Sequence, residues 1–331
     1  MAWSEAITVS AYQPSQAAEW RTFLADSNNG TLFHDLDFLE YHPPERFDTH
    51  HLLLKQNDKL IALLPAAIVS EPDGRRFLKS PYGGSVGGLV LPLEHNASTT
   101  LRLVSSLENY ASNLKLAGVE MRVAPNIYDR CPNDELSFAL MASGFTLAGR
   151  WLSHIIALPL DPGEVLNQLS NRRRSYVRSA LSQGLDVAVV DPEYLQPFYR
   201  ILEGNRAKHN ARPTHTLEEL ERIFRLTPDR VRLFACKRQD QMIAGTLVFE
   251  MNERVAYSFY PCHDYQFERY RPAAVVTVYV AQYYASHGFR YLDLGPTTFD
   301  DFSLNEGLAR FKEEMGGVGF CRDAWRWEVR T

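Results

Sequence analysis

The sequence lacks the features that would place it in a specialised class of protein. Its four cysteines, at positions 131, 236, 262 and 321, form no C-x-x-C pair and indicate neither a metal site nor a disulfide framework. The longest apolar run, residues 60–69, is shorter than the roughly 18 residues of a membrane helix and contains a proline. The N-terminal residues lack a signal-peptide pattern. We therefore expect a cytoplasmic protein with free thiols and no transmembrane segment.

The charge balance is slightly acidic. The chain has 35 Lys and Arg against 40 Asp and Glu, a net charge of -5, which argues against a general nucleic-acid coat and against DNA as a partner. With 45% hydrophobic and 23% charged residues the composition is that of an ordinary globular protein. The 331 residues are enough for about two domains, each with its own core.

The two halves of the chain follow much the same order of predicted elements. In each half a strand precedes two helices, three strands, a helix, a strand, a helix and a final strand, and the second series begins near Asp186. This order predicts an α/β (α+β) fold of two similar domains, each a mixed central sheet flanked by helices. The turn Asp161-Pro162-Gly163 marks the boundary, so we predict domains at residues 1–160 and 161–331.

An arginine cluster is the strongest chemical signal. Arg172, Arg173, Arg174 and Arg178 fall within a helix predicted over residues 163–183. No acidic residue lies between Glu164 and Asp186, and guanidinium groups pair well with phosphate or carboxylate. The pattern favours a site for a phosphate-bearing substrate. The alternative is a solvated helix face paired with acids elsewhere in the chain.

A second signal follows the strand that ends at Tyr260. A loop leads from Tyr260 to Pro272, where a proline at a helix start leaves free N–H groups that could receive an anion or a carbonyl oxygen. The loop contains no glycine and therefore does not resemble the glycine-rich cradle expected for the pyrophosphate of coenzyme A.

Glycines occur instead in the first half. Tyr82, Gly83 and Gly84 follow the corresponding third strand, and we predict a tight loop that contributes to substrate binding, with a purely structural turn as the alternative.

Two charged residues complete the candidate site. Asp293 ends a strand and Lys312 lies in the following helix, and strand ends in α/β folds point into ligand crevices. The alternatives are turn capping for Asp293 and a surface ion pair with Glu313 or Glu314 for Lys312.

These motifs together resemble a known family. The N-R-R-R-x-x-V-R segment, the strand end at Tyr260 with its proline-led helix, H-G-x-R-Y-L-D-L-G and F-K-x-x-x-G-G look like the FemAB-like group of the GNAT acyltransferase superfamily. The resemblance implies two tandem GNAT-like domains in a bacterial protein. It also implies acyl transfer to an amine, since better-understood members attach amino acids from aminoacyl-tRNA to peptidoglycan precursors and other relatives lie in exopolysaccharide or cell-envelope settings.

The resemblance also suggests roles for individual residues. Arg172, Arg173 and Arg178 match the family's basic segment, and Lys312 matches the lysine of its F-K motif. Both features are associated with phosphate-bearing substrates. Tyr260 and Asp293 match positions that line the second-domain cleft and are our candidate catalytic residues. The chain departs from the family in lacking the long helical-hairpin arm of some tRNA-dependent members and in having D-L-G-P instead of D-F-G.

We therefore expect an N-acyltransferase that acts on an amine of a cell-envelope or glycan precursor, without a permanently bound cofactor. The co-substrate is aminoacyl-tRNA or acyl-CoA. Direct attack by the amine is favoured over a covalent intermediate on Cys262, which is followed by His263 and Asp264 but lacks an identifiable catalytic arrangement. Two alternatives stay open: an acyl-CoA-dependent GNAT N-acetyltransferase acting on a small molecule or amino sugar, and a non-catalytic binding protein that keeps the fold.

Overall fold

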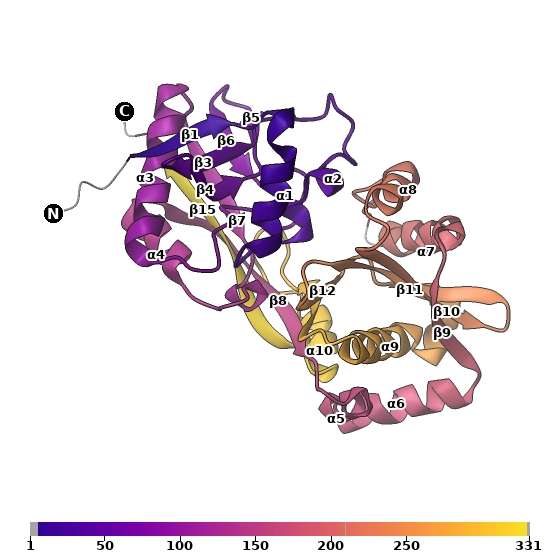
Figure 1. Cartoon of the computed structure of the whole chain (residues 1–331). Coiled ribbons are helices and arrows are strands. Elements are labelled where there is room, and N and C mark those ends of the chain that lie inside the picture. The colour runs from indigo at the N-terminus through magenta and orange to yellow at the C-terminus, as the bar shows by residue number, and fades with distance from the viewer. Residues whose placement is uncertain (1–5, 209, 330–331) are drawn as a thin grey trace. The chain divides into compact units, whose positions relative to one another are not determined.

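The chain forms two compact units. The computed structural model describes residues 6–208 and 210–329 (Figure 1). Unit 1 contains residues up to Trp151 together with the C-terminal segment from Cys321, and unit 2 contains Leu152–Phe320. The strands β8 (Thr146–Ala157) and β15 (Val318–Glu328) each begin in one unit and end in the other.

Unit 1 is built from short strands and four α-helices. Its further elements are β1 (Ile7–Ala11), η1 (Pro14–Gln16), α1 (Ala17–Asp26), η2 (Leu32–His34), α2 (Leu36–Leu39), β2 (Asp48–Thr49), β3 (Leu52–Gln56), β4 (Lys59–Leu64), β5 (Ala67–Ser70), β6 (Arg76–Ser80), α3 (Ala97–Asn113), β7 (Gly118–Val123), η3 (Asn126–Tyr128) and α4 (Glu135–Ala142). The strands β1, β3 and β4 form a three-stranded antiparallel sheet, and β2, β5, β6, β7 and β15 follow one another in a second sheet.

The second of the three successive strands predicted in the first half is interrupted. The apolar run at residues 60–69 reads as one strand in the sequence, but Pro65 separates β4 from β5, and the two strands belong to different sheets. Proline cannot donate to a strand ladder, which explains the break. The helix α3 buries Leu103, Val104 and Leu107 in the core of unit 1.

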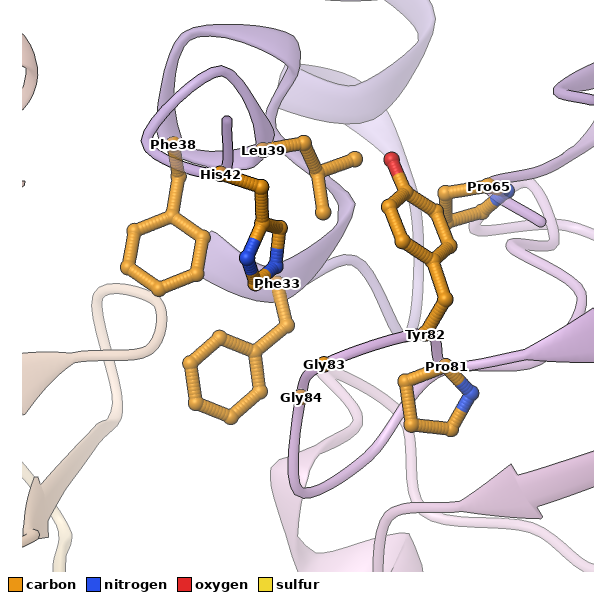
Figure 2. A pocket seen from close by; sticks show the side chains of 9 residues that line it. All are labelled: Phe33, Phe38, Leu39, His42, Pro65, Pro81, Tyr82, Gly83 and Gly84. Carbon is orange, nitrogen blue, oxygen red and sulfur yellow. The ribbon is translucent and has the colours of Figure 1, made fainter. Parts of the chain in front are cut away.

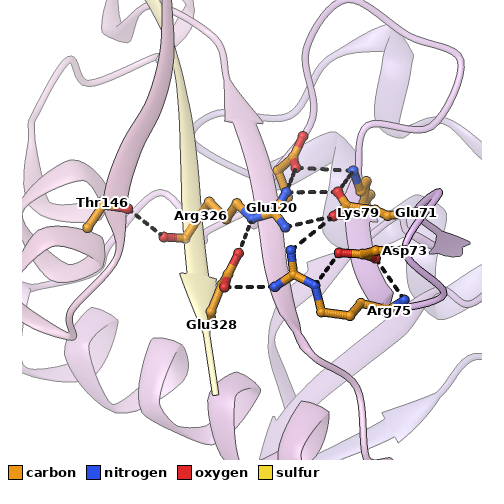
Figure 3. A network of polar contacts seen from close by, with 8 residues as sticks. All are labelled: Glu71, Asp73, Arg75, Lys79, Glu120, Thr146, Arg326 and Glu328. Atoms are coloured by element: carbon orange, nitrogen blue, oxygen red, sulfur yellow. Dashed lines mark hydrogen bonds and ion pairs between the residues drawn. The ribbon is translucent and has the colours of Figure 1, made fainter. Parts of the chain in front are cut away.

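The C-terminal strand is held in unit 1 by ion pairs (Figure 3). Arg326 on β15 donates to both carboxylate oxygens of Glu71, at 2.8 and 2.9 Å, and Lys79 reaches the same carboxylate at 2.9 Å. Residues 323–328 of β15 pair with β7, and Trp325 joins the core of unit 1. The sequence predicts that this segment belongs to the second domain, at residues 161–331. In the structure, residues from Cys321 onward belong to unit 1 instead.

Unit 2 surrounds one mixed sheet. Its elements besides β8 and β15 are η4 (Pro162–Glu164), α5 (Val165–Gln168), α6 (Asn171–Ser182), β9 (Leu185–Val190), η5 (Pro192–Tyr194), α7 (Leu195–Ala207), α8 (Leu217–Leu226), β10 (Val231–Arg238), β11 (Gln241–Glu250), β12 (Val255–Ser258), β13 (Cys262–His263), η6 (Tyr265–Tyr270), α9 (Pro272–Ser286), β14 (Tyr291–Pro296) and α10 (Glu306–Glu314). The strand order is β8-β14-β12-β11-β10-β9, in which only β12 and β14 are parallel.

Helices cover both faces of this sheet. In Figure 1, α6 and α9 lie on one side of β9 to β12, and α7 and α8 lie on the other. The helix α9 buries nine residues, among them Val275, Val278 and Tyr284, in a cluster that includes Phe234 of β10 and Val177 of α6.

One predicted helix is wrong in its extent. The sequence favours a single helix over residues 163–183, but the structure has α5 and α6 separated at Leu169 and Ser170. The Ser170 side chain accepts from the N–H of Arg173 and caps α6, while the Arg174 guanidinium donates to the carbonyl oxygens of Leu166 and Asn167 in α5. Polar caps therefore end one helix and start the next. The apolar side chain of Leu181 near the end of α6 is 48% exposed.

None of the helices in the described part of the chain has the length and apolarity needed to cross a membrane.

Candidate functional site

The β12 and β14 strands form a fork in unit 2. They pair in parallel over residues 255–257 and 291–293. Beyond this point Phe259 donates its N–H to Leu247 of β11 at 2.7 Å, whereas Pro296 of β14 pairs with Ser153 of β8. The ladder between β12 and β14 therefore stops at their carboxyl ends. Ligand crevices in α/β folds form at such carboxyl ends, so this edge is a candidate binding site.

Asp293 and Lys312 meet at the end of β14. Lys312 is 4% exposed, and its Nζ donates to the carbonyl oxygens of Gly295 at 2.8 Å and Pro296 at 2.9 Å. The fully buried Asp293 accepts from the N–H of Gly295 at 2.6 Å. The reading of Lys312 as half of a surface ion pair is wrong, since the side chain turns inward. The carboxylate of Asp293 stabilises the turn after the strand, which agrees with the alternative interpretation of this residue as a turn cap.

Gly295 is required at this place. Its φ is +80°, and a Cβ would come 3.3 Å from the ring of Tyr257 on β12. A side chain here would be strained and would press against the opposite arm of the fork. The glycine therefore keeps the two strand ends close.

A histidine that sequence reasoning missed lies beside these residues. His154 of β8 has 3% of its side chain exposed, with Nδ1 3.1 Å from the Thr297 hydroxyl and Nε2 3.5 Å from the Glu313 carboxylate. Burial lowers the pKa of His154, which favours the neutral imidazole. The pairing of β8 with β14 brings it here from 143 residues away. No local pattern in the sequence signals such a contact.

Tyr260 lies in a buried hydrogen-bonded cluster. Its side chain is 3% exposed, and its hydroxyl contacts Nδ1 of His215 at 2.8 Å, the N–H of Thr214 at 3.1 Å and the Thr214 hydroxyl. Burial raises the pKa of Tyr260, so the phenol stays protonated. These contacts connect the strand end to the segment before α8. No described interaction joins Tyr260 to Asp293.

Arginines surround the start of α9. Arg271 adopts a left-handed conformation with φ +52° immediately before Pro272, and its guanidinium lies 4.0 Å from the ring centre of Tyr176 on α6. The N-terminus of this 15-residue helix has no side-chain cap, so its free N–H groups favour an anion.

Two further arginines bracket the next aromatic ring. Arg238 and Arg269 each lie 4.7 Å from the ring centre of Tyr270. Arg178 is exposed on α6, two residues after Tyr176 and therefore on another face of the helix. We call Arg238, Arg269 and Arg271 the basic rim. No ion pair joins these three to a carboxylate in the described part of the chain, so their charge is available to an anionic ligand.

The other predicted arginines are engaged. Arg172 and Arg173 both bind the carboxylate of Glu314 on α10, with Nε of Arg173 at 2.6 Å, and Arg173 also covers the ring of Phe311. Burial raises the pKa of Glu314, but hydrogen bonds from the two arginines outweigh it and the net shift is downward. These two arginines therefore connect α6 to α10 through ion pairs. This agrees with the alternative interpretation of the sequence, in which the arginines pair with acids elsewhere in the chain.

Tyr82, Gly83 and Gly84 line a hollow within unit 1 (Figure 2). The hollow is shallow and open to solvent, and its other lining residues are mostly apolar: Phe33, Phe38, Leu39, His42, Pro65 and Pro81. Gly83 has φ +66°, and a Cβ there would come 2.4 Å from the His42 ring. The glycine is thus needed for both the turn and the packing.

Comparisons with known proteins agree with this architecture. Residues 165–313 match the acetyltransferase (GNAT) domain family. No curated protein matches the chain. Among solved structures, FemX is similar over 97% of both chains, with a TM-score of 0.73 and 15% identity.

Two other similar structures also cover the whole chain. A tandem GNAT protein from the clavulanic acid biosynthesis pathway matches 98% of this chain and 99% of its own, with a TM-score of 0.59 and 12% identity. L-PGS from Bacillus licheniformis matches 97% and 94%, with a TM-score of 0.59 and 13% identity. Residues 165–313 are therefore similar to a GNAT acetyltransferase domain, and the chain as a whole has the fold of FemX and of the tandem GNAT protein, as its resemblance to the FemAB-like group implied.

Proposed function

We propose that unit 2 transfers an acyl or aminoacyl group from an activated ester or thioester to an amine of a cell-envelope or glycan precursor. One observation carries the proposal: unit 2 contains both the fork between β12 and β14 and the uncapped N-terminus of α9, and both lie inside the segment that matches the GNAT family. The fork offers backbone groups to an extended donor, and the α9 N-terminus offers N–H groups to its phosphates.

The basic rim supports a donor with several phosphates. Acyl-CoA and aminoacyl-tRNA both fit this description, and three guanidinium groups without a carboxylate partner suit either. The glycine-free loop before Pro272 favours aminoacyl-tRNA, as does the FemAB-like resemblance. We therefore propose aminoacyl-tRNA as the first donor to test.

The proposed chemistry is direct transfer. The amine nitrogen bonds to the donor carbonyl carbon, the C–O or C–S bond breaks, and the proton lost by nitrogen goes to the departing alcohol or thiol. The Lys312 ammonium, buried at the fork, would stabilise negative charge that develops on the carbonyl oxygen. The neutral imidazole of His154 could accept the amine proton.

Cysteine chemistry is disfavoured by burial. Cys262 is 2% exposed, and burial raises the pKa of its thiol; burial also raises the pKa of Cys236 to about 12. We expect Cys262→Ala to keep acyl transfer within about threefold of the unsubstituted protein, since no thiolate takes part. Steady-state kinetics would check this, with the exposed Cys131→Ala as control. Complete loss of turnover in a folded Cys262→Ala protein would refute direct transfer.

The donor is tested by thermal stability. A ligand that binds the folded protein raises its melting temperature, so charged tRNA, acetyl-CoA and longer acyl-CoA esters are compared. We expect charged tRNA to stabilise the protein and Arg271→Gln to reduce the shift, while Arg225→Gln, an exposed arginine on α8, leaves it unchanged. Product formation with a panel of amines then tests transfer. Equal shifts for Arg271→Gln and the unsubstituted protein would refute the basic rim as the donor site.

Two alternatives give different outcomes in the same experiment. Stabilisation by acyl-CoA and not by tRNA would favour a GNAT N-acetyltransferase acting on a small molecule or amino sugar. The chain is similar over 98% of its length to a tandem GNAT protein whose structure was described without AcCoA. This similarity is the observation that favours acetyl-CoA as the alternative donor. Binding without turnover for every donor would favour a non-catalytic protein.

A further inference from the structure

A carboxylate, an imidazole and a hydroxyl lie in a row in unit 2. The Nε2 atom of His154 on β8 is 3.5 Å from the Glu313 carboxylate on α10. Its Nδ1 atom is 3.1 Å from the hydroxyl of Thr297, the residue after β14. Three different elements thus bring these side chains together, and the chemistry proposed above leaves Glu313 and Thr297 without a role.

Thr297 determines which nitrogen of His154 carries the proton. The Thr297 hydroxyl has one hydrogen, which it donates to the carbonyl oxygen of Leu152 at 2.9 Å. Its oxygen therefore accepts from His154, so Nδ1 carries the hydrogen of the neutral ring. Nε2 keeps its lone pair, 3.5 Å from the Glu313 carboxylate.

The titratable groups that act on the ring lie on α10 and β14. Burial lowers the pKa of His154 below its ordinary value, and the Lys312 ammonium adds to this shift. The carboxylates of Glu313 and Asp293 oppose the shift but do not outweigh it, so the ring is neutral at pH 7. A Cβ added at Gly317 would lie 3.1 Å from the Cβ of His154 and 2.9 Å from the Lys312 carbonyl oxygen. His154 is therefore packed against the end of α10 that carries Lys312.

Glu313 and Nε2 of His154 form a pair of acceptors without a donor. Neither a carboxylate nor a lone pair supplies a hydrogen, so no hydrogen bond joins them while the ring is neutral. Glu313 is 61% exposed and has no other ion pair in the part of the chain that the structure describes, whereas two arginines neutralise its neighbour Glu314. A ligand from solvent therefore meets a negative charge beside a basic nitrogen.

A protonated primary amine fits this pair. Its N–H groups can donate to the carboxylate and to Nε2 together, and its positive charge is attracted by Glu313. A quaternary ammonium has the charge without the donors, and an alcohol has a donor without the charge. Acyl transfer requires the uncharged amine, yet alkylamines are cations at neutral pH, with a pKa close to that of lysine at about 10.4. A site for such an acceptor must therefore remove a proton before the nitrogen attacks.

We propose that Glu313 and His154 bind the ammonium group of the acceptor and that Nε2 of His154 takes one of its protons. The amine then attacks the donor carbonyl carbon, and the second proton leaves with the departing alcohol or thiol. The imidazolium afterwards releases its proton to solvent. Thr297 is a positioning residue, because it keeps the hydrogen of the neutral ring on Nδ1. This inference rests on the proposed acyl transfer for the use of the amine, but ammonium binding requires no donor.

The first test is nuclear magnetic resonance of the full-length protein without a donor. The histidine side chains are labelled with an NMR-active nitrogen isotope, and the His154 signals are identified by their absence from His154→Gln. We expect Nδ1 to carry the proton at neutral pH. We also expect methylammonium to shift the Nε2 signal, and tetramethylammonium and methanol to leave it unchanged.

Substitutions on α10 then locate the ammonium. Glu313→Gln should weaken methylammonium binding about threefold or more, because it removes the negative charge. Glu306→Gln, an exposed acid of the same helix, is the matched control and should bind as the unsubstituted protein does. A proton on Nε2 of the free protein, no response to methylammonium, or equal binding by Glu313→Gln would each overturn the proposal.

The second test is the pH dependence of transfer to a primary alkylamine below saturation. If the ammonium form binds and His154 removes the proton, the rate is constant from about pH 7 to 9, where the amine in solution stays a cation. If free amine must be taken from solution, the rate rises about tenfold for each pH unit. We expect a constant rate for the unsubstituted protein and for Glu306→Gln, and the tenfold rise for His154→Gln. A tenfold rise in the unsubstituted protein would refute proton transfer to His154.

The role of Thr297 is tested by retaining or removing its hydroxyl. Thr297→Val removes the acceptor beside Nδ1, so the proton should move to Nε2 and the transfer rate should fall about tenfold or more. Thr297→Ser keeps the hydroxyl and should keep both the Nδ1 proton and the rate. In both variants the N–H of residue 297 still donates to the Leu152 carbonyl, as it does at 2.7 Å in the unsubstituted protein. Identical nitrogen signals in the valine and serine variants would contradict the positioning role.

The two proposals can fail separately. Ammonium binding at Glu313 and His154 without transfer from any donor would refute the acyltransferase function and leave the amine site. Transfer that rises tenfold per pH unit in the unsubstituted protein as well as in His154→Gln would support the function and refute the amine site.

Discussion

At the scale of single residues, a buried lysine dominates the candidate site. Lys312 places a positive charge at the end of β14 with only 4% of its surface exposed and with two backbone carbonyl oxygens as acceptors. A buried ammonium is tolerated only where it is hydrogen-bonded, and the two carbonyl oxygens meet this requirement.

We expect Lys312→Met to affect both stability and catalysis. The substitution leaves the Gly295 and Pro296 carbonyl oxygens without their donor, at a cost of about 1–3 kcal/mol each. Acyl transfer should fall by about 100-fold or more if the ammonium stabilises the developing oxyanion. Thermal melting and kinetics measure the two effects, with the exposed Lys59→Met as control. An unchanged melting temperature would contradict the anchoring role.

At the scale of secondary-structure elements, hydrogen bonds between distant segments decide how strand ends are held. The Tyr260 hydroxyl is the common partner of Thr214 and His215, which precede α8. Tyr260 is in our interpretation a positioning residue that fixes the segment between α7 and α8 against the strand end.

Tyr260→Phe should loosen this segment. Without the hydroxyl, the polar groups of Thr214 and His215 lose a buried partner, which should destabilise the fold by about 1–3 kcal/mol. Amide hydrogen exchange over residues 211–216 should become faster. Tyr265→Phe is the control, because its hydroxyl binds no other described residue. Equal exchange in both variants would refute the positioning role.

The ion-pair network around β15 makes a pH-dependent contribution. Hydrogen bonds from Arg326 and Lys79 lower the pKa of Glu71 from 4.5 to about 2. The unfolded chain takes up this proton near the ordinary pKa, so the stabilisation is complete above about pH 4.5 and is lost as the pH falls toward 2.

Glu71→Gln should therefore lower the melting temperature at pH 7, by an amount equivalent to roughly 1 kcal/mol, and much less at pH 2.5. Melting of both proteins across this range measures the difference. The exposed Glu45→Gln should show no such pH dependence. A difference that stays constant from pH 7 to 2.5 would exclude the Glu71 carboxylate as its source.

At the scale of the whole molecule, the C-terminal segment completes a unit that begins at the other end of the chain. Residues 323–328 pair with β7, and Trp325 is 8% exposed in the core of unit 1. Folding of unit 1 therefore requires residues 321–328, which follow the whole of unit 2 in the sequence.

Ending the chain after Phe320 should prevent unit 1 from folding. The truncation removes a paired strand and a core tryptophan, a loss of several kcal/mol, which exceeds much of the stability of an ordinary domain. Limited proteolysis should cleave within residues 6–151 while fragments of unit 2 persist. A chain ending after Val329 is the control and should resist proteolysis. Equal resistance of both would contradict the dependence of unit 1 on β15.

The sequence by itself determined the order of elements and the tandem arrangement. Apolar periodicity and turn residues are local signals that predict helices over residues 273–287 and 307–315 and a strand over 290–295. The structure has α9, α10 and β14 within one residue of these ranges. The sequence correctly predicts a helix that carries the arginines, but it does not predict that this helix is divided into α5 and α6. The division depends on capping by Ser170 and Arg174, which apolar periodicity does not indicate.

Only the tertiary structure decided which charges are available. Glu314 lies 142 residues after Arg172 and neutralises it with Arg173, while the arginines of the basic rim gain tyrosine rings and no carboxylate. His154 reaches Thr297 only through strand pairing. Ion pairs and burial depend on partners that are distant in sequence and near in space, and local patterns carry no record of them.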